Sequence, residues 1–193
     1  MAESNGKMSS VEFTNLRRQQ FRQYFQPSRI VLGVIPAPTK SGVNVITLCF
    51  DMYCSYKPPM MAIAVQNVNA SYKLIQNCEE FVLAVPGVSM VQEALFCGTR
   101  SMTEADKVEA LGLKLCDSTS VAVPGLQSAI ANIELTKETC IRTGDHMLCI
   151  GSVRRFAVNK SATDLPLLSV GPDTRGYKVL ATHGIHRIAT VAA

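Results

Sequence analysis

Residues 43–65, VNVITLCFDMYCSYKPPMMAIAV, contain two apolar runs separated by a polar segment and a proline pair. The first run, residues 43–50, alternates in character and follows a β-branched run at 29–36 across a short turn, which predicts a hairpin. The second run, residues 60–65, is apolar throughout and predicts a buried strand. The proline pair ends the segment between the runs, because proline lacks the N–H that a strand interior requires.

A patch of small polar residues follows this strand, formed by Asn67, Asn69 and Ser71. A short helix is predicted at 71–77 and a further strand at 80–86, so the patch lies at a helix start. Ser71 is predicted to be the N-cap, whose hydroxyl accepts a hydrogen bond from a helix N–H. Helix-start amides and small hydroxyls also bind anions. The local sequence leaves both roles open, a cap alone or an anion site.

Three further helices are predicted from capping-box spacing, in which Ser or Thr precedes an acidic residue or Gln by three positions. The pairs are Ser9 with Glu12, Ser89 with Gln92, and Thr103 with Asp106. Gly112 is predicted to end the last of these helices, because glycine readily adopts the left-handed conformation found at helix ends. Residues 1–9 are expected to form a disordered tail, and residues 181–193 a C-terminal extension.

The second half of the chain is mostly β-forming. Strands are predicted at residues 113–116, 121–124, 128–141, 146–158, 166–170 and 177–180, with a tight hairpin turn at Gly144-Asp145. Roughly eight strands with three or four short helices do not alternate as βαβ units do. The sequence therefore predicts a mainly β fold, an antiparallel Greek-key β-barrel with flanking helices.

The composition predicts one domain spanning residues 1–193, since domains are typically about 100–200 residues long. The net charge of +4 is spread thinly and Trp is absent, which argues against a nucleic-acid partner. The start of the chain shows no signal-peptide pattern, and the sequence has no run of about 18 apolar residues that would cross a membrane. We therefore expect a cytoplasmic protein with neither nucleic-acid nor membrane partners.

The seven cysteines are odd in number, form no CxxC pair and lie mostly within apolar runs. We expect free thiols in a reducing cytoplasm, with no disulfide framework and no metal site. The segment HGIH holds His183 and His186, which could ligate a metal, but a polar tail is favoured because a metal site needs further ligands. The sequence contains none of the phosphate-binding glycine loops, and no GxSxG or HExxH motif.

Five segments, in order and at consistent spacing, resemble the flavin reductase-like family of FMN-binding split barrels, most closely its flavoredoxin branch. Residues 43–65 carry Asn44, Thr47, Ser55 and the Pro58-Pro59 pair at the family's spacing. In residues 69–86, Ser71 opens the short helix, and in residues 95–113 the sequence FCGTRS precedes an Asp-Lys pair. Residues 143–153 contain Gly-Asp-His, and residues 166–180 resemble the family's closing strand pair. The resemblance covers about residues 28–180 and implies a split β-barrel that buries FMN at a homodimer interface.

The resemblance also implies which residues bind FMN. One set would contact the flavin ring and ribityl chain: Asn44, Thr47, Leu48, Cys49, Phe50, Met52, Tyr53 and Ser55. A second set would hold the phosphate through amides, hydroxyls and cationic groups: Asn67, Asn69, Ser71, Arg100, Ser101 and Lys107.

His146 follows the Gly-Asp turn, and taken alone it is explained as a hydrogen-bonded turn residue. The resemblance instead implies that His146 is catalytic and lies over the flavin, where it helps to hold NADH or NADPH. Arg175 and Tyr177 are implied to close the substrate side of the site. The implied function is an NAD(P)H-dependent flavin or flavoprotein reductase that passes hydride to FMN. Two alternatives stay open: a flavoredoxin-like electron carrier between proteins, and a split barrel repurposed for a small metabolite.

The implied partners are a second copy of the chain, the nicotinamide reductant, and a redox protein or monooxygenase. The chain departs from the family pattern in two places. Residues 48–52 replace small or hydroxyl residues and place Asp51 where its charge would oppose negative charge on a reduced flavin. No glycine closely follows Ser101, where relatives commonly have one.

Overall fold

The structure, a computed structural model, describes residues 25–192, so the predicted N-terminal tail and the helix predicted from Ser9 lie outside the described residues. The helices are α2 (Ser71–Asn77), α3 (Val91–Thr99) and α4 (Lys107–Leu111), with a 3₁₀ turn at Val88–Met90 before α3. The strands are β1 (Ser28–Arg29), β2 (Val31–Pro36), β3 (Val43–Leu48), β4 (Asp51–Tyr56), β5 (Pro59–Gln66), β6 (Glu80–Val85), β7 (Leu115–Cys116), β8 (Gly125–Leu126), β9 (Ala131–Thr143), β10 (His146–Val158), β11 (Leu168–Val170), β12 (Tyr177–His183) and β13 (His186–Val191).

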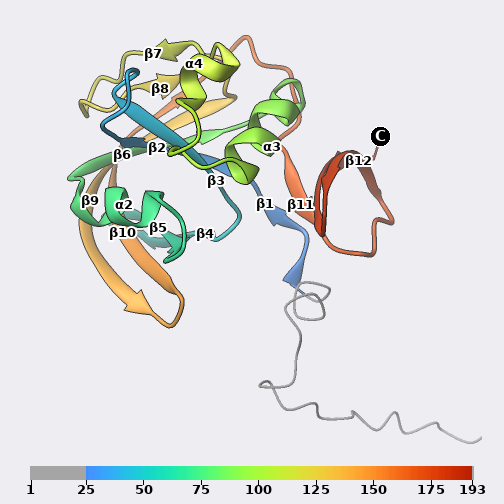
Figure 1. The fold of residues 1–193 in the computed structure, drawn as a ribbon, viewed down its shortest axis with the longest axis horizontal. Coiled ribbons are helices and arrows are strands. Elements are labelled where there is room, and N and C mark those ends of the chain that lie inside the picture. The colour runs from blue at the N-terminus through green and yellow to red at the C-terminus, as the bar shows by residue number, and fades with distance from the viewer. Residues whose placement is uncertain (1–24, 193) are drawn as a thin grey trace, which may run out of the picture.

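The described strands form antiparallel sheets, which confirms the predicted mainly β class (Figure 1). The largest sheet has seven strands in the order β3-β2-β6-β9-β10-β5-β4. A second sheet, in the order β1-β11-β13-β12, lies beside α3, and β7 pairs with β8. An extension was expected at residues 181–193, yet residues 181–183 complete β12 and residues 186–191 form β13, an inner strand of the second sheet. His183 and His186 pair across the β12–β13 hairpin instead of lying in a polar tail.

The side chains of strand β2 are apolar along its length, which fits its position between two hydrophobic clusters that cover its two faces. Val31 and Ile35 belong to a cluster that collects buried side chains from six strands of the large sheet. Leu32 and Val34 belong to a second cluster, which reaches α3, α4 and β13. Alternate side chains of a strand point to opposite faces, so helices and the second sheet must cover the outer face of β2. The helices are thereby anchored over β3, where the pocket described below lies.

The two predicted hairpins are confirmed. Strands β2 and β3 pair from Val31 with Leu48 to Pro36 with Val43, across the predicted turn. Strands β9 and β10 pair from Thr143 with His146 outward, and Gly144 adopts the left-handed φ of 57° that this tight turn requires. From the sequence, the segment after β3 was described only as a polar stretch between two strands, with residues implied to contact the cofactor. Much of it is instead β4, an edge strand paired with β5.

The predicted helix caps are wrong at three positions. The N-cap of α2 is Ala70 with no side-chain cap, because the Ser71 hydroxyl is hydrogen-bonded to Asn44 instead. Helix α3 begins at Val91 after the 3₁₀ turn, so Ser89 does not cap it. Asp106, not Thr103, caps α4 by accepting hydrogen bonds from two backbone N–H groups in the first turn. Gly112 ends α4 with a φ of 60°, as predicted.

Residues 121–124 were predicted as a strand but form none. Buried Glu134 on β9 accepts hydrogen bonds from the backbone N–H groups of Thr119 and Ser120. Glu80 accepts another from Ala122. These carboxylates occupy backbone donors that a strand would give to a neighbouring strand, so the segment is held as an ordered loop.

Cys140 and Cys149 form a disulfide, which corrects the expectation that all seven cysteines are free. They lie opposite each other on β9 and β10, with Cα atoms 4.1 Å apart. Pairs on either side of a two-residue hairpin turn alternate between hydrogen-bonded and closer non-hydrogen-bonded positions. Counting outward from Thr143 and His146, the pair Cys140 and Cys149 falls on a close position. The other five cysteines are free thiols.

We predict that this disulfide stabilises the fold measurably. Its sequence separation is 9, and closing a loop of that size is worth about 2–3 kcal/mol of unfolding free energy in the chain-entropy model. Denaturant unfolding with and without a dithiol reductant should therefore show a loss of about that size on reduction. The double variant Cys140→Ala/Cys149→Ala should be insensitive to the reductant. Equal sensitivity in both proteins would contradict a role for this pair.

Candidate functional site

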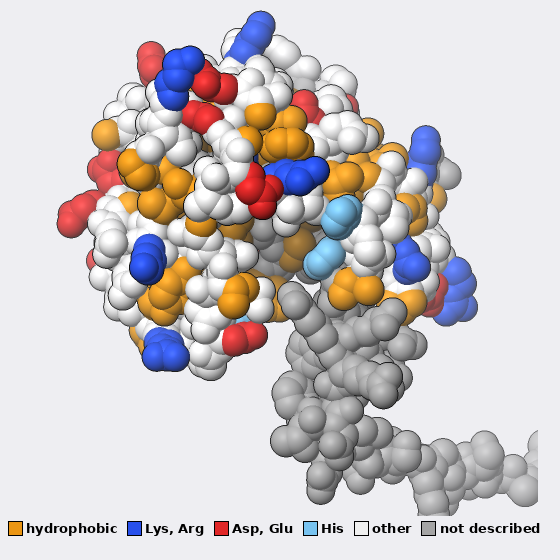
Figure 2. Space-filling model, viewed as in Figure 1, with side chains coloured by type: hydrophobic (Ala, Val, Ile, Leu, Met, Phe, Trp, Pro, Cys, Tyr) orange, Lys and Arg blue, Asp and Glu red, His pale blue; other side chains and the backbone are white. Residues whose placement is uncertain are grey.

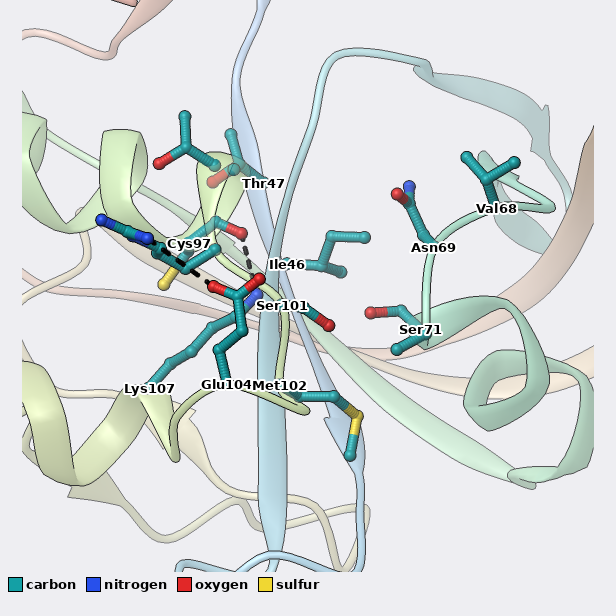
Figure 3. A pocket seen from close by; sticks show the side chains of 14 residues that line it. Ile46, Thr47, Val68, Asn69, Ser71, Cys97, Ser101, Met102, Glu104 and Lys107 are labelled. Carbon is teal, nitrogen blue, oxygen red and sulfur yellow. Dashed lines mark hydrogen bonds and ion pairs between the residues drawn. The ribbon is translucent and has the colours of Figure 1, made fainter.

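A pocket of about 240 Å³ lies over β3, between the loop that precedes α2 and the segment that joins α3 to α4 (Figure 3). Two features of its wall stand out, small hydroxyl groups and cationic side chains. Six of the predicted cofactor residues line it although they are far apart in the sequence: Thr47, Asn69, Ser71, Arg100, Ser101 and Lys107. The fold thus assembles most of the predicted phosphate set in one place.

Lys107 is the buried cation of this pocket, with only 4% of its surface exposed. Its Nζ donates hydrogen bonds to the carbonyl oxygens of Val45, at 2.8 Å, and Cys97, at 2.9 Å. Burial lowers the pKa of Lys107, while nearby Cys97 and Glu104 act to raise it. Within residues 25–192, no carboxylate forms an ion pair with this ammonium. An ammonium has three donors, so one remains for a bound group.

Asp106 positions Lys107 at the start of α4. Its carboxylate accepts hydrogen bonds from the backbone N–H groups of Val108 and Glu109, and from the N–H and hydroxyl of Ser41. Burial alone would raise the pKa of Asp106, but these hydrogen bonds outweigh it and the pKa lies below its ordinary value. The ionised carboxylate therefore ties the first turn of α4 to the β2–β3 turn.

Asn44 and Ser71 form a buried pair that joins β3 to α2. The Asn44 Nδ2 donates to the Ser71 Oγ at 2.8 Å, and both residues are almost fully buried. The Asn44 Oδ1 has no partner within the described part of the chain. In Figure 3 the Ser71 hydroxyl points toward the pocket, so its proton is placed for an acceptor there. Asn44 itself is not among the residues that line the pocket, and it contacts the pocket residue Ser71 through this hydrogen bond.

Helix α3 approaches β3 closely at Gly98. A Cβ at this position would lie 3.1 Å from the Thr47 Cβ, which is tighter than normal packing. Thr47 in turn donates from its Oγ1 to the carbonyl of Ala94 at 2.6 Å. The buried Cys97 beside it has a pKa raised to about 11, chiefly by burial, so its thiol stays protonated at neutral pH. Cys97 contributes its carbonyl to the site and not a reactive sulfur.

His146 belongs to a separate group of residues on the β4 side. Its Nδ1 lies 2.6 Å from the Asp145 Oδ1, and its ring centroid is 5.4 Å from that of Phe50. Beside them on β4, Met52 and Tyr53 are about half exposed, at 55% and 49%. The backbone N–H of Asn67 donates to the Asp145 carbonyl, which links this hairpin to the loop before α2.

The negative charge of Asp51, which was expected to lie near the flavin, is offset by the positive charge of Arg29. The Arg29 guanidinium pairs with the Asp51 carboxylate at 2.5 Å. The guanidinium carbon of Arg29 also lies 5.9 Å from the centre of the Tyr53 ring. Asp51 is therefore part of an ion pair and adds little net charge to this face.

The remaining predicted residues lie elsewhere. The Leu48 side chain is buried in the cluster enclosed by the large sheet, and Cys49 packs against the other cluster. Ser55 lies opposite Met60 on the β4–β5 pair. The structure does not bring Arg175 into the pocket, since its guanidinium binds Asp173, whose pKa falls to about 2. Tyr177 is likewise outside the pocket, at the start of β12.

Several pocket residues were not predicted from the sequence, above all Gly98, Met102 and Glu104. A glycine inside a helix is a signal for close backbone approach, but the helix predicted from Ser89 ended at residue 96, so the signal at Gly98 was missed. Glu104 carries no comparable signal, because a single acidic residue in a polar loop has no preferred role.

Three further findings concern the part of the chain that the structure describes. No group of three or more His, Cys, Asp or Glu side chains there is arranged to hold a metal ion. No helix there is both long and apolar enough to span a membrane. On the face of the molecule seen in Figure 2, the charged side chains are scattered and do not gather in one patch.

Comparison with known proteins defines the class. The model of the flavin reductase-like domain matches residues 28–177. An uncharacterised protein of Archaeoglobus fulgidus is 33% identical over 134 residues, which are 68% of this chain and 72% of the relative. The chain belongs to the flavin reductase-like family.

Solved structures agree on the fold. An FMN-binding protein from Thermus thermophilus with bound p-hydroxybenzaldehyde superposes with a TM-score of 0.75 at 17% identity, covering 96% of this chain and 98% of its own. Flavoredoxin from Methanosarcina acetivorans gives 0.73 at 17% identity, with 97% and 92% covered. An NADH:FAD oxidoreductase from Streptomyces globisporus, in complex with NAD and FAD fragments, gives 0.71 at 17% identity, with 86% and 94% covered. The chain has the split-barrel fold of these FMN-binding and flavoredoxin proteins, as the resemblance implied.

The Asn44–Ser71 pair yields a stability prediction. Ser71→Ala should lower the free energy of unfolding by about 1–3 kcal/mol, because it leaves the buried Asn44 amide without an acceptor. The same substitution in an Asn44→Ala background should cost much less, which a double-mutant cycle from denaturant unfolding would measure. Equal costs in both backgrounds would indicate that the lost group serves α2 alone, as a cap would.

Proposed function

We propose that this protein binds FMN and acts as an NAD(P)H-dependent flavin or flavoprotein reductase. Membership of the flavin reductase-like family supports flavin-related redox chemistry. The observation that carries the choice of a flavin nucleotide is the buried ammonium of Lys107, which faces a hydroxyl-lined pocket with one donor unused. A buried cation without a carboxylate partner is stabilised by a bound anion, and the phosphate of FMN is such an anion.

The pocket fits one end of the nucleotide. Its volume of about 240 Å³ is below the roughly 300–1,000 Å³ typical of sites that enclose whole drug-sized ligands. We therefore assign to it the phosphate end, held by Lys107 and Arg100 with the hydroxyls of Ser71 and Ser101. The guanidinium of Arg100 can bind two phosphate oxygens at once, whereas Lys107 acts as a point charge. The flavin ring would extend toward Phe50 and the exposed face of β4.

The roles of the chain's own groups follow from their positions. Bound FMN supplies the hydride-accepting chemistry. Asp145 accepts a hydrogen bond from the His146 Nδ1–H, which leaves the Nε2 atom free to accept one from the reductant. Phe50 packs beside the imidazole and limits its movement. His146 thus orients the nicotinamide, and the lysine and arginine hold the opposite end of the site.

We further propose that a second copy of the chain covers the β4 face. Its exposed hydrophobic side chains include Phe50, at 57%, and Tyr56, at 85%. β4 is also an unpaired edge of the large sheet, and uncovered apolar edges favour association. Light scattering should give the mass of two chains, and the mass of one chain would contradict this arrangement.

The proposed location is the cytoplasm, where nicotinamide reductants and redox partner proteins are available. The Cys140–Cys149 disulfide removes the support that free thiols alone would give, so the proposal rests on the reductant. The fold shared with flavoredoxin supports one alternative function, an electron carrier between proteins. A monooxygenase is a further candidate partner. The two functions differ in turnover. A reductase oxidises NADH continuously when free FMN is supplied, whereas a carrier requires its protein partner.

The phosphate assignment predicts a charge-dependent preference for FMN over riboflavin. Lys107→Met should weaken FMN binding roughly tenfold or more while leaving riboflavin binding nearly unchanged, because only FMN presents a charged acceptor. Flavin fluorescence titration measures both. Lys40→Met removes an exposed, ion-paired lysine outside the pocket and should change neither affinity. A wild-type protein that takes up no FMN would refute the proposed function.

The proposed role of His146 predicts a kinetic defect without loss of cofactor. His146→Ala should retain FMN but slow its reduction by NADH roughly tenfold or more, because the nicotinamide is less well oriented. Loss of the flavin's visible absorbance after anaerobic mixing measures this rate. His183→Ala, on the second sheet, is the matched control and should leave the rate unchanged. Normal reduction by the His146 variant would remove this residue from the mechanism.

A further inference from the structure

Glu104 places a carboxylate inside the cationic pocket. Its side chain lines the same cavity as Arg100 and Lys107. Its Oε2 lies 3.7 Å from the Arg100 Nη1, an ion pair drawn as a dashed line in Figure 3. This carboxylate is also one of the groups that act to raise the pKa of Lys107, so its charge reaches both cations.

The local backbone explains why the carboxylate lies there. The N–H of Glu104 donates to the carbonyl of Ser101, which closes a turn between α3 and α4. The hydroxyl of Ser101 accepts hydrogen bonds from the backbone N–H and hydroxyl of Thr103. Arg100 and Glu104 are therefore held at the two ends of one short turn, and the turn borders the pocket.

Two facts indicate that this ion pair does not serve stability alone. Both partners are largely exposed, at 62% for Arg100 and 56% for Glu104, so their attraction is screened by water. A contact of 3.7 Å is also longer than a charge-assisted hydrogen bond, which leaves the guanidinium free to bind another acceptor. Both residues line the pocket that contains the buried ammonium of Lys107.

We propose that Glu104 sets the affinity of the pocket for phosphate, as an internal anion that competes with the ligand's phosphate for Arg100. This inference rests on the proposed function, since it requires that the pocket binds a phosphate. A phosphate dianion carries more charge than the carboxylate and binds the guanidinium through two oxygens, so it displaces Glu104. A ligand without that charge does not displace it. Glu104 thus weakens the binding of a phosphate and has no effect on a ligand that carries no such charge.

The test compares FMN and riboflavin binding to wild type, Glu104→Gln and Glu109→Gln at low salt. Glu104→Gln should tighten FMN binding about three- to tenfold, because one competing charge is removed, and leave riboflavin binding unchanged. The effect should shrink in high salt. Glu109 forms an exposed ion pair with Lys40 outside the pocket, so Glu109→Gln is a charge-matched control and should bind both flavins as wild type does.

A second comparison isolates the competition for Arg100. In an Arg100→Gln background, Glu104→Gln should tighten FMN binding clearly less than it does in wild type. Glu104→Ala provides a second variant without a polar side chain and should behave as Glu104→Gln does.

The outcomes separate the two proposals. If wild type binds FMN no more tightly than riboflavin, the phosphate pocket and the proposed function fail. If wild type prefers FMN but neither Glu104 variant tightens its binding, the function stands and the role of Glu104 is refuted. Equal tightening with and without Arg100 would also refute the competition, because the effect would then be a general change of charge.

Discussion

The two hydrogen bonds from the Lys107 ammonium to the carbonyls of Val45 and Cys97 join three of the elements that border the pocket: β3, α3 and the start of α4. Burying an ammonium costs several kcal/mol unless polar groups surround it. The two carbonyls and the Asp106 cap hold the side chain in place, but no carboxylate among the described residues 25–192 forms an ion pair with its charge. The site is therefore organised around a cation, and the flavin phosphate proposed here would complete it.

The scaffold makes this arrangement possible because the large sheet is covered on both faces. One hydrophobic cluster lies within the sheet, and the other fastens α3, α4 and the second sheet to its outer side. Gly98 allows α3 to come close to Thr47, which narrows the space over β3. The cationic pocket and the His146 hairpin are linked through the loop before α2, where Asn67 meets Asp145. The two parts of the proposed site are thus linked within one framework.

Prediction from the sequence succeeded where the signal was local. Alternating or continuous apolar runs gave the β2–β3 and β9–β10 hairpins, and Gly112 marked the end of α4. It failed for the caps at Ser71, Ser89 and Thr103, because spacing shows which side chains are able to cap and not which other partners compete for them. The disulfide was missed although its register follows from the Gly144-Asp145 turn, which places Cys140 opposite Cys149. The cysteines were counted, but the residue pairs outward from the hairpin turn were not, so the facing positions of Cys140 and Cys149 were missed.

By itself the sequence determined the mainly β class, the order of most elements and the resemblance to flavin reductase-like proteins, since these depend on periodicity and on short motifs. Only the tertiary structure decided that Ser71 binds Asn44, 27 positions away, and that Lys107 binds the carbonyl of Val45, 62 positions away. It also placed Glu104 against Arg100 inside the pocket. The packing of the sheet against the helices decides which polar groups meet. Because a buried polar group without a hydrogen-bond partner is costly, each of these groups needs such a partner.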